Sequence, residues 1–382
     1  IYHRQMTAND LPTPFYIVYE ERLRANLELI RDVSRRSGAD IIMAFKANAL
    51  WKSFDIVREY CRDCTASSLN ELRLGREYLG GEIHSYTPAY TEANIDEFIA
   101  GSTHITFNSL GQYRRFGAQV RTAGVSAGLR VNPKGSVIDT DLYNPALPGS
   151  RFGVNADEVA DGLPEGIEGL HFHALCESSS YDLEKVLAAF EEKFGHLLPS
   201  LKWVNMGGGH LMTRKGYDTE HLIKVLLDFK QRSPWLRVIL EPGSAFTWQT
   251  GDLVASVVDT VTDGGLPTAI LDVSFACHMP DTLEMPYLPV VAESTDKEHS
   301  TGTPWRLGGN SCLSGDFKGD YFFARSPEIG DRLTLCDMNH YTTVKTTMFN
   351  GVAHPDIVLQ GLDGQCRYLR QFTYDDYKNR MS

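Results

Sequence analysis

The sequence predicts an α/β protein built from a (β/α)8 TIM-like barrel and a smaller β domain. Eight short apolar, β-rich runs recur between residues 39 and 243, and amphipathic helical patterns separate most of them. After Trp248 the helical periodicity stops and short β-like runs replace it. A regular alternation of strand and helix gives a parallel sheet, and eight such units close a barrel. The length of 382 residues suits one barrel with a companion domain.

The first barrel strand is predicted over 41–45, directly before Lys46. Apolar residues at helical spacing predict helices over 21–36, 183–198 and 219–232. An open doubly wound sheet is the alternative, but it would not usually need eight strands, and no G-x-G-x-x-G follows the first one. The other seven strands are expected around 65–67, 83–86, 105–107, 128–131, 170–173, 203–206 and 238–241. The connection 132–168 departs from the pattern because it includes a loop with Pro and Gly.

The β domain is predicted from short apolar runs broken by Gly and Pro, without long helical periodicity. Residues 15–19 lie outside the eight barrel strands and could add a strand to this domain. We therefore place the barrel at 20–248 and the β domain at 1–19 and 249–382. The runs on which the β domain rests are 253–258, 268–271, 332–335 and 357–359.

Composition excludes several classes of function. The net charge of −12 argues against a nucleic-acid partner and is compatible with a small cationic substrate. No apolar run approaches the roughly 18 residues that span a bilayer, and the first residues carry no apolar signal core, so a cytoplasmic protein is expected. The seven cysteines are scattered. The single C-x-x-C, Cys61 with Cys64, lacks a second pair, and we expect no metal.

An active site in such a barrel lies at the carboxyl ends of the strands. Lys46 there is either a snorkelling edge residue or a desolvated amine able to react with a carbonyl. The run Gly207-Gly208-Gly209 is either a flexible turn or a loop whose backbone N–H groups bind a phosphate. The strand-end residues to weigh are Lys46, Ser67, Asn108, Asn132, His173, Gly207, Gly208, Gly209 and Glu241.

Glu241 and His173, at two further strand ends, could each have more than one role. Glu241 could pair with a pyridinium nitrogen, ligate a metal or cap a helix. His173 could stack on an aromatic ring, although a lone histidine is more often a hydrogen-bonded core residue. Together an amine, a phosphate-binding loop, a carboxylate and a flat ring are what pyridoxal 5'-phosphate requires.

With these residues in place, the chain resembles the fold-type III pyridoxal-phosphate decarboxylases, the group that includes ornithine and diaminopimelate decarboxylases and shares its fold with alanine racemase. The likeness covers nearly the whole chain, and five motifs occur in order at similar spacing. They are Phe45-Lys46-Ala47-Asn48, Thr65-Ala66-Ser67-Ser68 with Glu71, Phe172-His173, Gly207-Gly208-Gly209 and Glu241-Pro242-Gly243.

Within that group the likeness is greatest to the carboxynorspermidine (carboxyspermidine) decarboxylases of polyamine biosynthesis. The chain departs from other members at two places. Ala174-Leu175-Cys176 replaces the usual x-Gly-Ser after the histidine, which points away from diaminopimelate and ornithine decarboxylases, and Ser244 stands where many relatives have Arg, which leaves one phosphate contact unassigned. The stretches that carry the likeness are 171–177, 277–281, 310–316 and 341–351.

The resemblance implies a pyridoxal-phosphate carboxy-lyase and a homodimer with shared active sites. Lys46 would hold the cofactor, His173 would support its ring, and Glu241 would pair with its pyridine nitrogen and keep that nitrogen protonated. Cys312 of the partner subunit would supply a proton, although a buried structural thiol is the alternative. The phosphate would be bound by the glycine loop together with Gly243 and Tyr341. Asp316, and more weakly Asp272, would meet a cationic tail.

Rival functions remain open at this point. A diaminopimelate, ornithine or arginine decarboxylase, or a racemase, would use the same scaffold. A non-catalytic relative would bind cofactor without turnover. A metal-dependent barrel hydrolase would need converging ligands, and only His173 and Glu241 qualify. Carboxynorspermidine and carboxyspermidine differ by one methylene, which a pocket distinguishes by roughly 1–3 kcal/mol.

Overall fold

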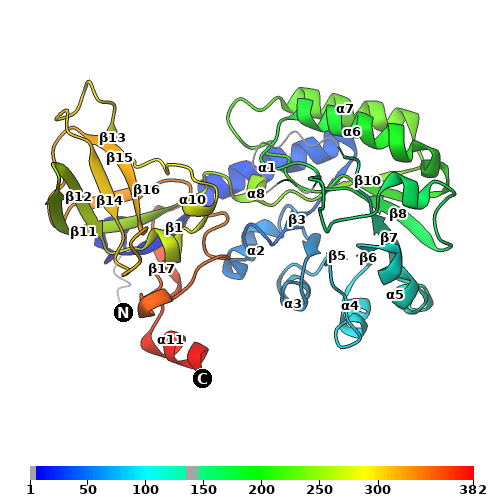
Figure 1. Cartoon of the computed structure of the whole chain (residues 1–382), viewed down its shortest axis with the longest axis horizontal. Coiled ribbons are helices and arrows are strands. Elements are labelled where there is room, and N and C mark those ends of the chain that lie inside the picture. The colour runs from blue at the N-terminus through cyan, green and yellow to red at the C-terminus, as the bar shows by residue number, and fades with distance from the viewer. Residues whose placement is uncertain (1–5, 135–143, 145) are drawn as a thin grey trace. The chain divides into compact units, whose positions relative to one another are not determined.

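The computed structural model describes residues 6–134, 144 and 146–382. The chain forms two compact units, one from Ala25 to Phe246 and the other from the residues up to Arg24 together with Thr247–Ser382 (Figure 1). No helix among the described residues is long and apolar enough to cross a bilayer.

The unit from Ala25 to Phe246 is a parallel barrel, as the sequence predicts. All neighbouring strands run in the same direction, and helices follow most of them (Figure 1). The strands are β2 (Asp40–Ile41), β3 (Met43–Ala44), β4 (Cys64–Ala66), β5 (Ile83–Tyr86), β6 (His104–Phe107), β7 (Ser126–Arg130), β8 (Ile167–His171), β9 (Trp203–Asn205) and β10 (Arg237–Leu240).

The barrel closes through its first strand, which is divided into β2 and β3 at Ile42. β2 pairs with β10, and β3 pairs with β4 on the other side. The Ile42 N–H continues the first pairing by donating to Leu240 O at 2.9 Å. The two segments therefore act as one strand with a neighbour on each side. This confirms the predicted eight-strand barrel.

Serine caps set the starts of several barrel helices. Ser68 and Ser109 accept a hydrogen bond from the backbone N–H three residues on, which satisfies a free donor of the first turn. Ser179 caps α6 in the same way, so this helix begins three residues before the predicted start, and it continues as a 3-10 helix up to Ser200. The helices are α1 (Glu20–Ser37), α2 (Phe54–Val57), α3 (Leu69–Tyr78), α4 (Ile95–Gly101), α5 (Leu110–Thr122), α6 (Ser180–Phe194), α7 (Thr219–Arg232) and α8 (Ser244–Thr247).

The indole of Trp203 fills part of the barrel interior. A Cβ added at Gly169 or Gly128 would lie 2.0 or 2.3 Å from the indole, so two strands must carry glycine there. The Trp203 Nε1–H donates to Ser126 Oγ at 2.9 Å, and its ring meets the His104 ring edge-on. The glycines therefore make room for one large side chain, which packs against three neighbouring strands.

The other unit is a mixed sheet with strand order β13-β15-β14-β12-β11-β1-β17-β18, and β16 also pairs with β11. β1 (Phe15–Tyr19) lies between β11 and β17, which confirms the strand expected at 15–19. The sequence did not predict β14, β15, β18 or the last helix, α11 (Tyr374–Met381). The other elements are β11 (Gly251–Asp263), β12 (Leu266–Leu271), α9 (Phe275–His278), α10 (Asp281–Glu284), β13 (Ser294–Thr295), β14 (Trp305–Gly308), β15 (Phe317–Phe323), β16 (Arg332–Leu335), β17 (Asp356–Gln360) and β18 (Cys366–Arg370).

The packing around Trp203 gives a test of the barrel interior. Gly169→Ala should destabilise the protein by about 1–3 kcal/mol, because the new methyl overlaps the indole and forces it to move. Gly195→Ala is the matched control: it has helical φ and open space around the added Cβ, so stability should be unchanged or slightly higher. Urea unfolding of both variants measures this, and equal midpoints would contradict the packing described.

Candidate active site

Four groups expected at the active site follow four strands that are neighbours around the barrel. His173 lies two residues after β8, the glycine loop begins two residues after β9, and Glu241 directly follows β10. Lys46 lies in the turn after β3, the continuation of the strand that pairs with β10. Because carboxyl ends of parallel strands meet at one rim, these groups share the same end of the barrel.

The carboxylate of Glu241 is held by two strand residues. One oxygen lies 3.1 Å from His171 Nε2, and the other accepts a hydrogen bond from Asn205 Nδ2 at 3.0 Å. Burial raises the pKa of Glu241, but His171 and the Asn205 amide outweigh it and bring the pKa to about 2. Glu241 is therefore an ionised carboxylate within a buried setting, able to pair with a cationic ring nitrogen.

Asn205 joins this carboxylate to the glycine loop. Its Oδ1 accepts a hydrogen bond from the Gly207 N–H at 2.8 Å while its Nδ2 binds Glu241. The next N–H, that of Gly208, donates to His173 Nδ1 at 2.9 Å. Two of the N–H groups that the sequence assigns to a phosphate thus bind side chains in this structure. The loop therefore positions His173 and Asn205.

Close packing explains why this loop consists of glycines. Gly207 and Gly209 have positive φ values of 71° and 88°, which favour glycine. A Cβ at Gly207 would lie 2.5 Å from Phe172 O, one at Gly208 2.7 Å from Glu241 O, and one at Gly209 2.4 Å from the carbonyl of Leu175. Gly243 is similarly constrained, because its Cβ would lie 2.7 Å from that of Ala47 beside Lys46.

The His173 imidazole is neutral and has a defined tautomer. Its Nδ1 accepts the Gly208 N–H, so a proton on the neutral ring belongs on Nε2. Burial, followed by the charges of Lys46 and Arg130, keeps the pKa of His173 well below its usual range. A neutral flat ring fixed at one edge is suited to stacking on a planar ligand.

The Lys46 amine has a lowered pKa. The side chain remains accessible to solvent, yet protein atoms crowd its amine. This desolvation lowers the pKa of Lys46, and the Arg130 guanidinium adds to the effect, whereas Cys176, Glu241 and Glu71 oppose it. The lowered pKa increases the share of neutral amine, which is the form that attacks a carbonyl.

Arg130 is a site residue that the sequence did not reveal. It is the last residue of β7 and is buried, with its guanidinium 4.7 Å from the Tyr86 ring centroid and 4.5 Å from that of Phe152. Its Nη2 also donates to His173 O at 3.4 Å. An arginine within an apolar strand gives no signal in the sequence, because the residues that follow the strands are the ones expected at the barrel rim.

The remaining strand-end candidates have structural hydrogen bonds. Asn108 Oδ1 accepts from the Tyr86 hydroxyl at 2.7 Å and from the Gly153 N–H at 3.0 Å. The Ser67 N–H donates to Glu71 in the first turn of α3, and Asn132 Oδ1 accepts from the Lys134 N–H. These residues shape the rim around the four groups.

The charge on Arg130 gives a test of the Lys46 environment. Arg130→Gln removes a positive charge that lowers the pKa of Lys46, so this pKa should rise and less neutral amine should remain at neutral pH. We expect the pH midpoint for covalent attachment of pyridoxal to Lys46 to move upward. Pyridoxal lacks the phosphate, so an altered phosphate contact does not affect the result. Exposed Arg151, which also lies over Phe152, gives the control Arg151→Gln. An unchanged or lower midpoint in Arg130→Gln would contradict the electrostatic argument.

Four predicted site residues belong to the sheet unit. Cys312 is exposed, and its N–H donates to Asn350 Oδ1 at 2.8 Å. Tyr341 is partly buried and has a positive φ of 48°. The Asp272 carboxylate accepts from the Thr13 hydroxyl at 2.7 Å and from the Ser256 N–H at 2.8 Å. These contacts tie Asp272 to the sheet.

Asp316 is buried within the loop that carries Cys312. Its Oδ1 accepts from the Ala276 N–H at 3.0 Å, and its Oδ2 accepts from the Ser311 N–H at 3.2 Å and the Ser311 hydroxyl. Both oxygens are thus engaged inside their own unit. This geometry favours a role in holding the Cys312 loop over direct binding of a substrate tail.

Kinetics distinguish the two roles of Asp316. If it holds the loop, Asp316→Ala should lower kcat by more than it raises KM, because Cys312 is no longer held in position. Ser311→Ala, which removes one of the same hydrogen bonds, should act in the same direction with a smaller effect. A raised KM with unchanged kcat in Asp316→Ala would instead support contact with the substrate tail.

Comparisons with known proteins define the class of the chain. The family described as "Pyridoxal-dependent decarboxylase, C-terminal sheet domain" matches residues 15–339, and the chain belongs to this family. It is 46% identical over 374 residues to the carboxyaminopropylagmatine decarboxylase of Synechocystis sp., covering 98% of this chain and 96% of the relative. It is 43% identical over 380 residues to the carboxynorspermidine/carboxyspermidine decarboxylase of Campylobacter jejuni, covering 97% and 98%.

Solved structures agree with this assignment. Carboxynorspermidine decarboxylase from Campylobacter jejuni, complexed with norspermidine, matches with a TM-score of 0.89 and 42% identity over 97% of this chain and all of that one. The diaminopimelate decarboxylase of Helicobacter pylori matches with a TM-score of 0.81 at 17% identity, which shows the shared fold alone. The predicted fold class and decarboxylase family are confirmed.

Proposed function

We propose that this chain is a pyridoxal-phosphate decarboxylase of carboxynorspermidine and carboxyspermidine, producing norspermidine and spermidine. The observation that carries the substrate class is the match, over nearly the whole chain, to a decarboxylase named for these two compounds and to its norspermidine complex. The substrate would be a small cationic amino acid, which suits a chain with a net charge of −12.

The residues at the barrel rim fit the cofactor. Lys46, with its lowered pKa, would attach to the aldehyde carbon, and the ionised Glu241 would keep the pyridine nitrogen protonated. When bound, pyridoxal phosphate supplies an electron sink for the pair left by departing carbon dioxide. His173 would support one face of the ring, and the loop Gly207-Gly208-Gly209, with Gly243 and Tyr341, would bind the phosphate.

Cys312 would supply the proton that replaces the lost carboxylate. The thiol belongs to an exposed loop that Asp316 and Asn350 hold in place. An exposed position suits a group that acts on a substrate bound outside its own unit. We propose that it acts in the active site of the partner subunit of a homodimer. The pair of sites would then form only in the assembled dimer.

A second substrate follows from the similarity to the Synechocystis enzyme at 46% identity. Carboxyaminopropylagmatine ends in a guanidinium, whereas the carboxypolyamines end in a primary ammonium. The guanidinium is planar and forms paired hydrogen bonds with a carboxylate, so a pocket built for one group should bind the other less well. Comparing turnover of the two kinds of substrate therefore distinguishes a carboxypolyamine decarboxylase from a carboxyaminopropylagmatine decarboxylase.

Carbon dioxide release under equal conditions tests the proposal. Purified holoenzyme would receive carboxynorspermidine, carboxyspermidine, carboxyaminopropylagmatine, diaminopimelate, ornithine and arginine in separate reactions, with Lys46→Ala as the control. We expect the highest kcat/KM for the two carboxypolyamines and none in the control. A higher kcat/KM for carboxyaminopropylagmatine would make that compound the substrate in place of the carboxypolyamines. Turnover confined to diaminopimelate, ornithine or arginine would overturn the substrate class.

Mixing two inactive variants tests the shared site. In a heterodimer of Lys46→Ala and Cys312→Ala, one site carries both mutations and the other carries neither. Random pairing after subunit exchange should therefore restore about a quarter of the wild-type activity. Cys336→Ala, a partly buried thiol of the same unit, should be active alone. Absence of recovery despite proven exchange would contradict a site shared between subunits.

A further inference from the structure

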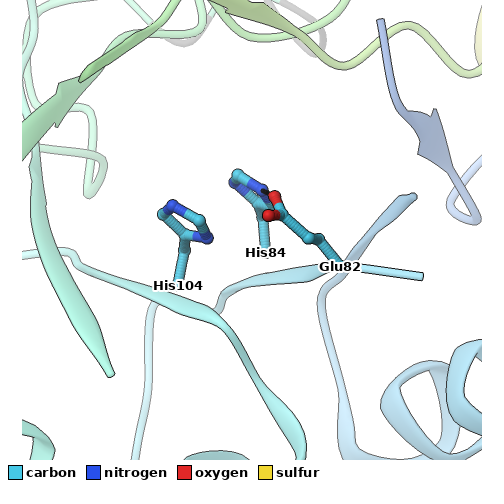
Figure 2. A group of neighbouring side chains, drawn as sticks. All are labelled: Glu82, His84 and His104. Atoms are coloured by element: carbon cyan, nitrogen blue, oxygen red, sulfur yellow. Dashed lines mark hydrogen bonds and ion pairs between the residues drawn. The ribbon is translucent and has the colours of Figure 1, made fainter. Parts of the chain in front are cut away.

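A second group of polar side chains lies inside the barrel at the opposite end from Lys46. His84 and His104 stand near the amino-terminal ends of β5 and β6, and Glu82 directly precedes β5 (Figure 2). One possible ligand atom from each side chain lies within 4.8 Å of the other two. We propose that Glu82, His84 and His104 form a binding site for a divalent transition-metal ion of the zinc type. Two imidazoles and a carboxylate are a ligand set that such ions take in proteins.

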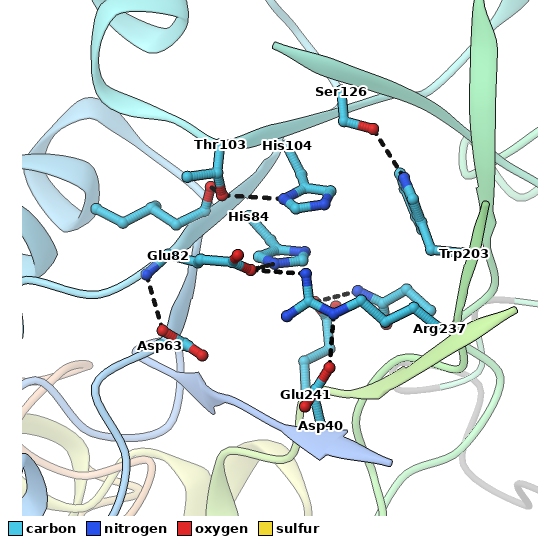
Figure 3. A network of polar contacts seen from close by, with 12 residues as sticks. Asp40, Asp63, Glu82, His84, Thr103, His104, Ser126, Trp203, Arg237 and Glu241 are labelled. Carbon is cyan, nitrogen blue, oxygen red and sulfur yellow. Dashed lines mark hydrogen bonds and ion pairs between the residues drawn. The ribbon is translucent and has the colours of Figure 1, made fainter. Parts of the chain in front are cut away.

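A neighbouring hydroxyl orients His104 as a ligand. Thr103 Oγ1 donates to Ile83 O at 3.1 Å and lies 2.9 Å from His104 Nδ1 (Figure 3). Since the hydroxyl hydrogen is used by Ile83 O, the hydroxyl accepts from His104 Nδ1–H. The lone pair of a neutral imidazole is then on Nε2. An outer hydrogen bond that fixes the tautomer in this way is typical of metal-binding histidines.

The charges around the site favour a cation even though Arg237 is close. Arg237 Nη1 lies 2.8 Å from Glu82 Oε2, and its Nε lies 2.6 Å from Asp40 Oδ2 (Figure 3). Two carboxylates thus face one guanidinium. The neighbouring Asp63, whose carboxylate accepts the Glu82 N–H, adds another negative charge. These charged groups around the two imidazoles therefore sum to a net negative charge.

Binding requires a local change of the histidine rings. They are stacked with centroids 3.9 Å apart and planes 10° apart. A metal lies close to the plane of each imidazole that binds it, so two stacked parallel rings cannot both direct a lone pair at one ion. One ring must turn about its Cβ–Cγ bond. The Glu82 side chain, which is 39% exposed, gives an ion access from solvent.

Zinc titration of the full-length holoenzyme by calorimetry tests the proposal. We expect one ion per chain in the wild type, and affinity at least tenfold weaker in His104→Gln. Thr103→Val keeps all three ligands but removes the orienting hydroxyl, and affinity should fall by about 10–100-fold. Because Thr103 is exposed, this variant also tests the proposal if His104→Gln does not fold. His299→Gln is the control, since His299 pairs with Asp296 on the surface of the other unit.

Three results would overturn the site. These are no zinc binding by the wild type, equal affinity in wild type and both barrel variants, and loss of the ion in His299→Gln alone. Decarboxylase activity is a separate readout, because none of these residues belongs to the proposed catalytic site. If the proposed decarboxylase function proves wrong, calorimetry still tests the metal site independently.

Discussion

The candidate active site depends on how the barrel closes. The first strand pairs with β10 through β2 and with β4 through β3, so the turn that carries Lys46 comes beside the segment that follows β10. The Ala44 N–H donates to Pro242 O at 3.2 Å, and Gly243 leaves no room for a side chain against Ala47. Closure therefore brings together an amine from the start of the barrel sequence and a carboxylate from its end.

Burial and neighbouring charges set the protonation of the groups at this rim. Burial and Arg130 lower the pKa of the Lys46 amine and of His173, while His171 and Asn205 keep Glu241 ionised in the same surroundings. Asn205 also connects Glu241 to the glycine loop, so the carboxylate and the proposed phosphate site share one support. An amine with a lowered pKa beside a stable anion is the combination that suits a pyridinium aldehyde.

The features that could be predicted from the sequence depend on hydrophobic periodicity and on position at the ends of strands. The eight strands and the residues directly after them could be predicted because apolar runs end abruptly at Lys46 and Glu241. Arg130, His171 and Asn205 could not, since they lie on the strands themselves and their partners come from other strands. The resemblance implied a substrate contact at Asp316, whereas in the structure one carboxylate oxygen accepts from Ala276 of α9 and the other from Ser311 of the Cys312 loop. Only tertiary structure reveals such pairings, and the same holds for Glu82, His84 and His104.

The central claim is that Lys46 is the amine that holds pyridoxal phosphate. It is tested most directly by incubating the protein with the cofactor, reducing with borohydride and locating the modified lysine by peptide mass mapping. The account predicts one modification per chain, on the peptide that contains Lys46, and none at exposed lysines such as Lys185. Modification of another lysine with Lys46 unmodified would contradict the account.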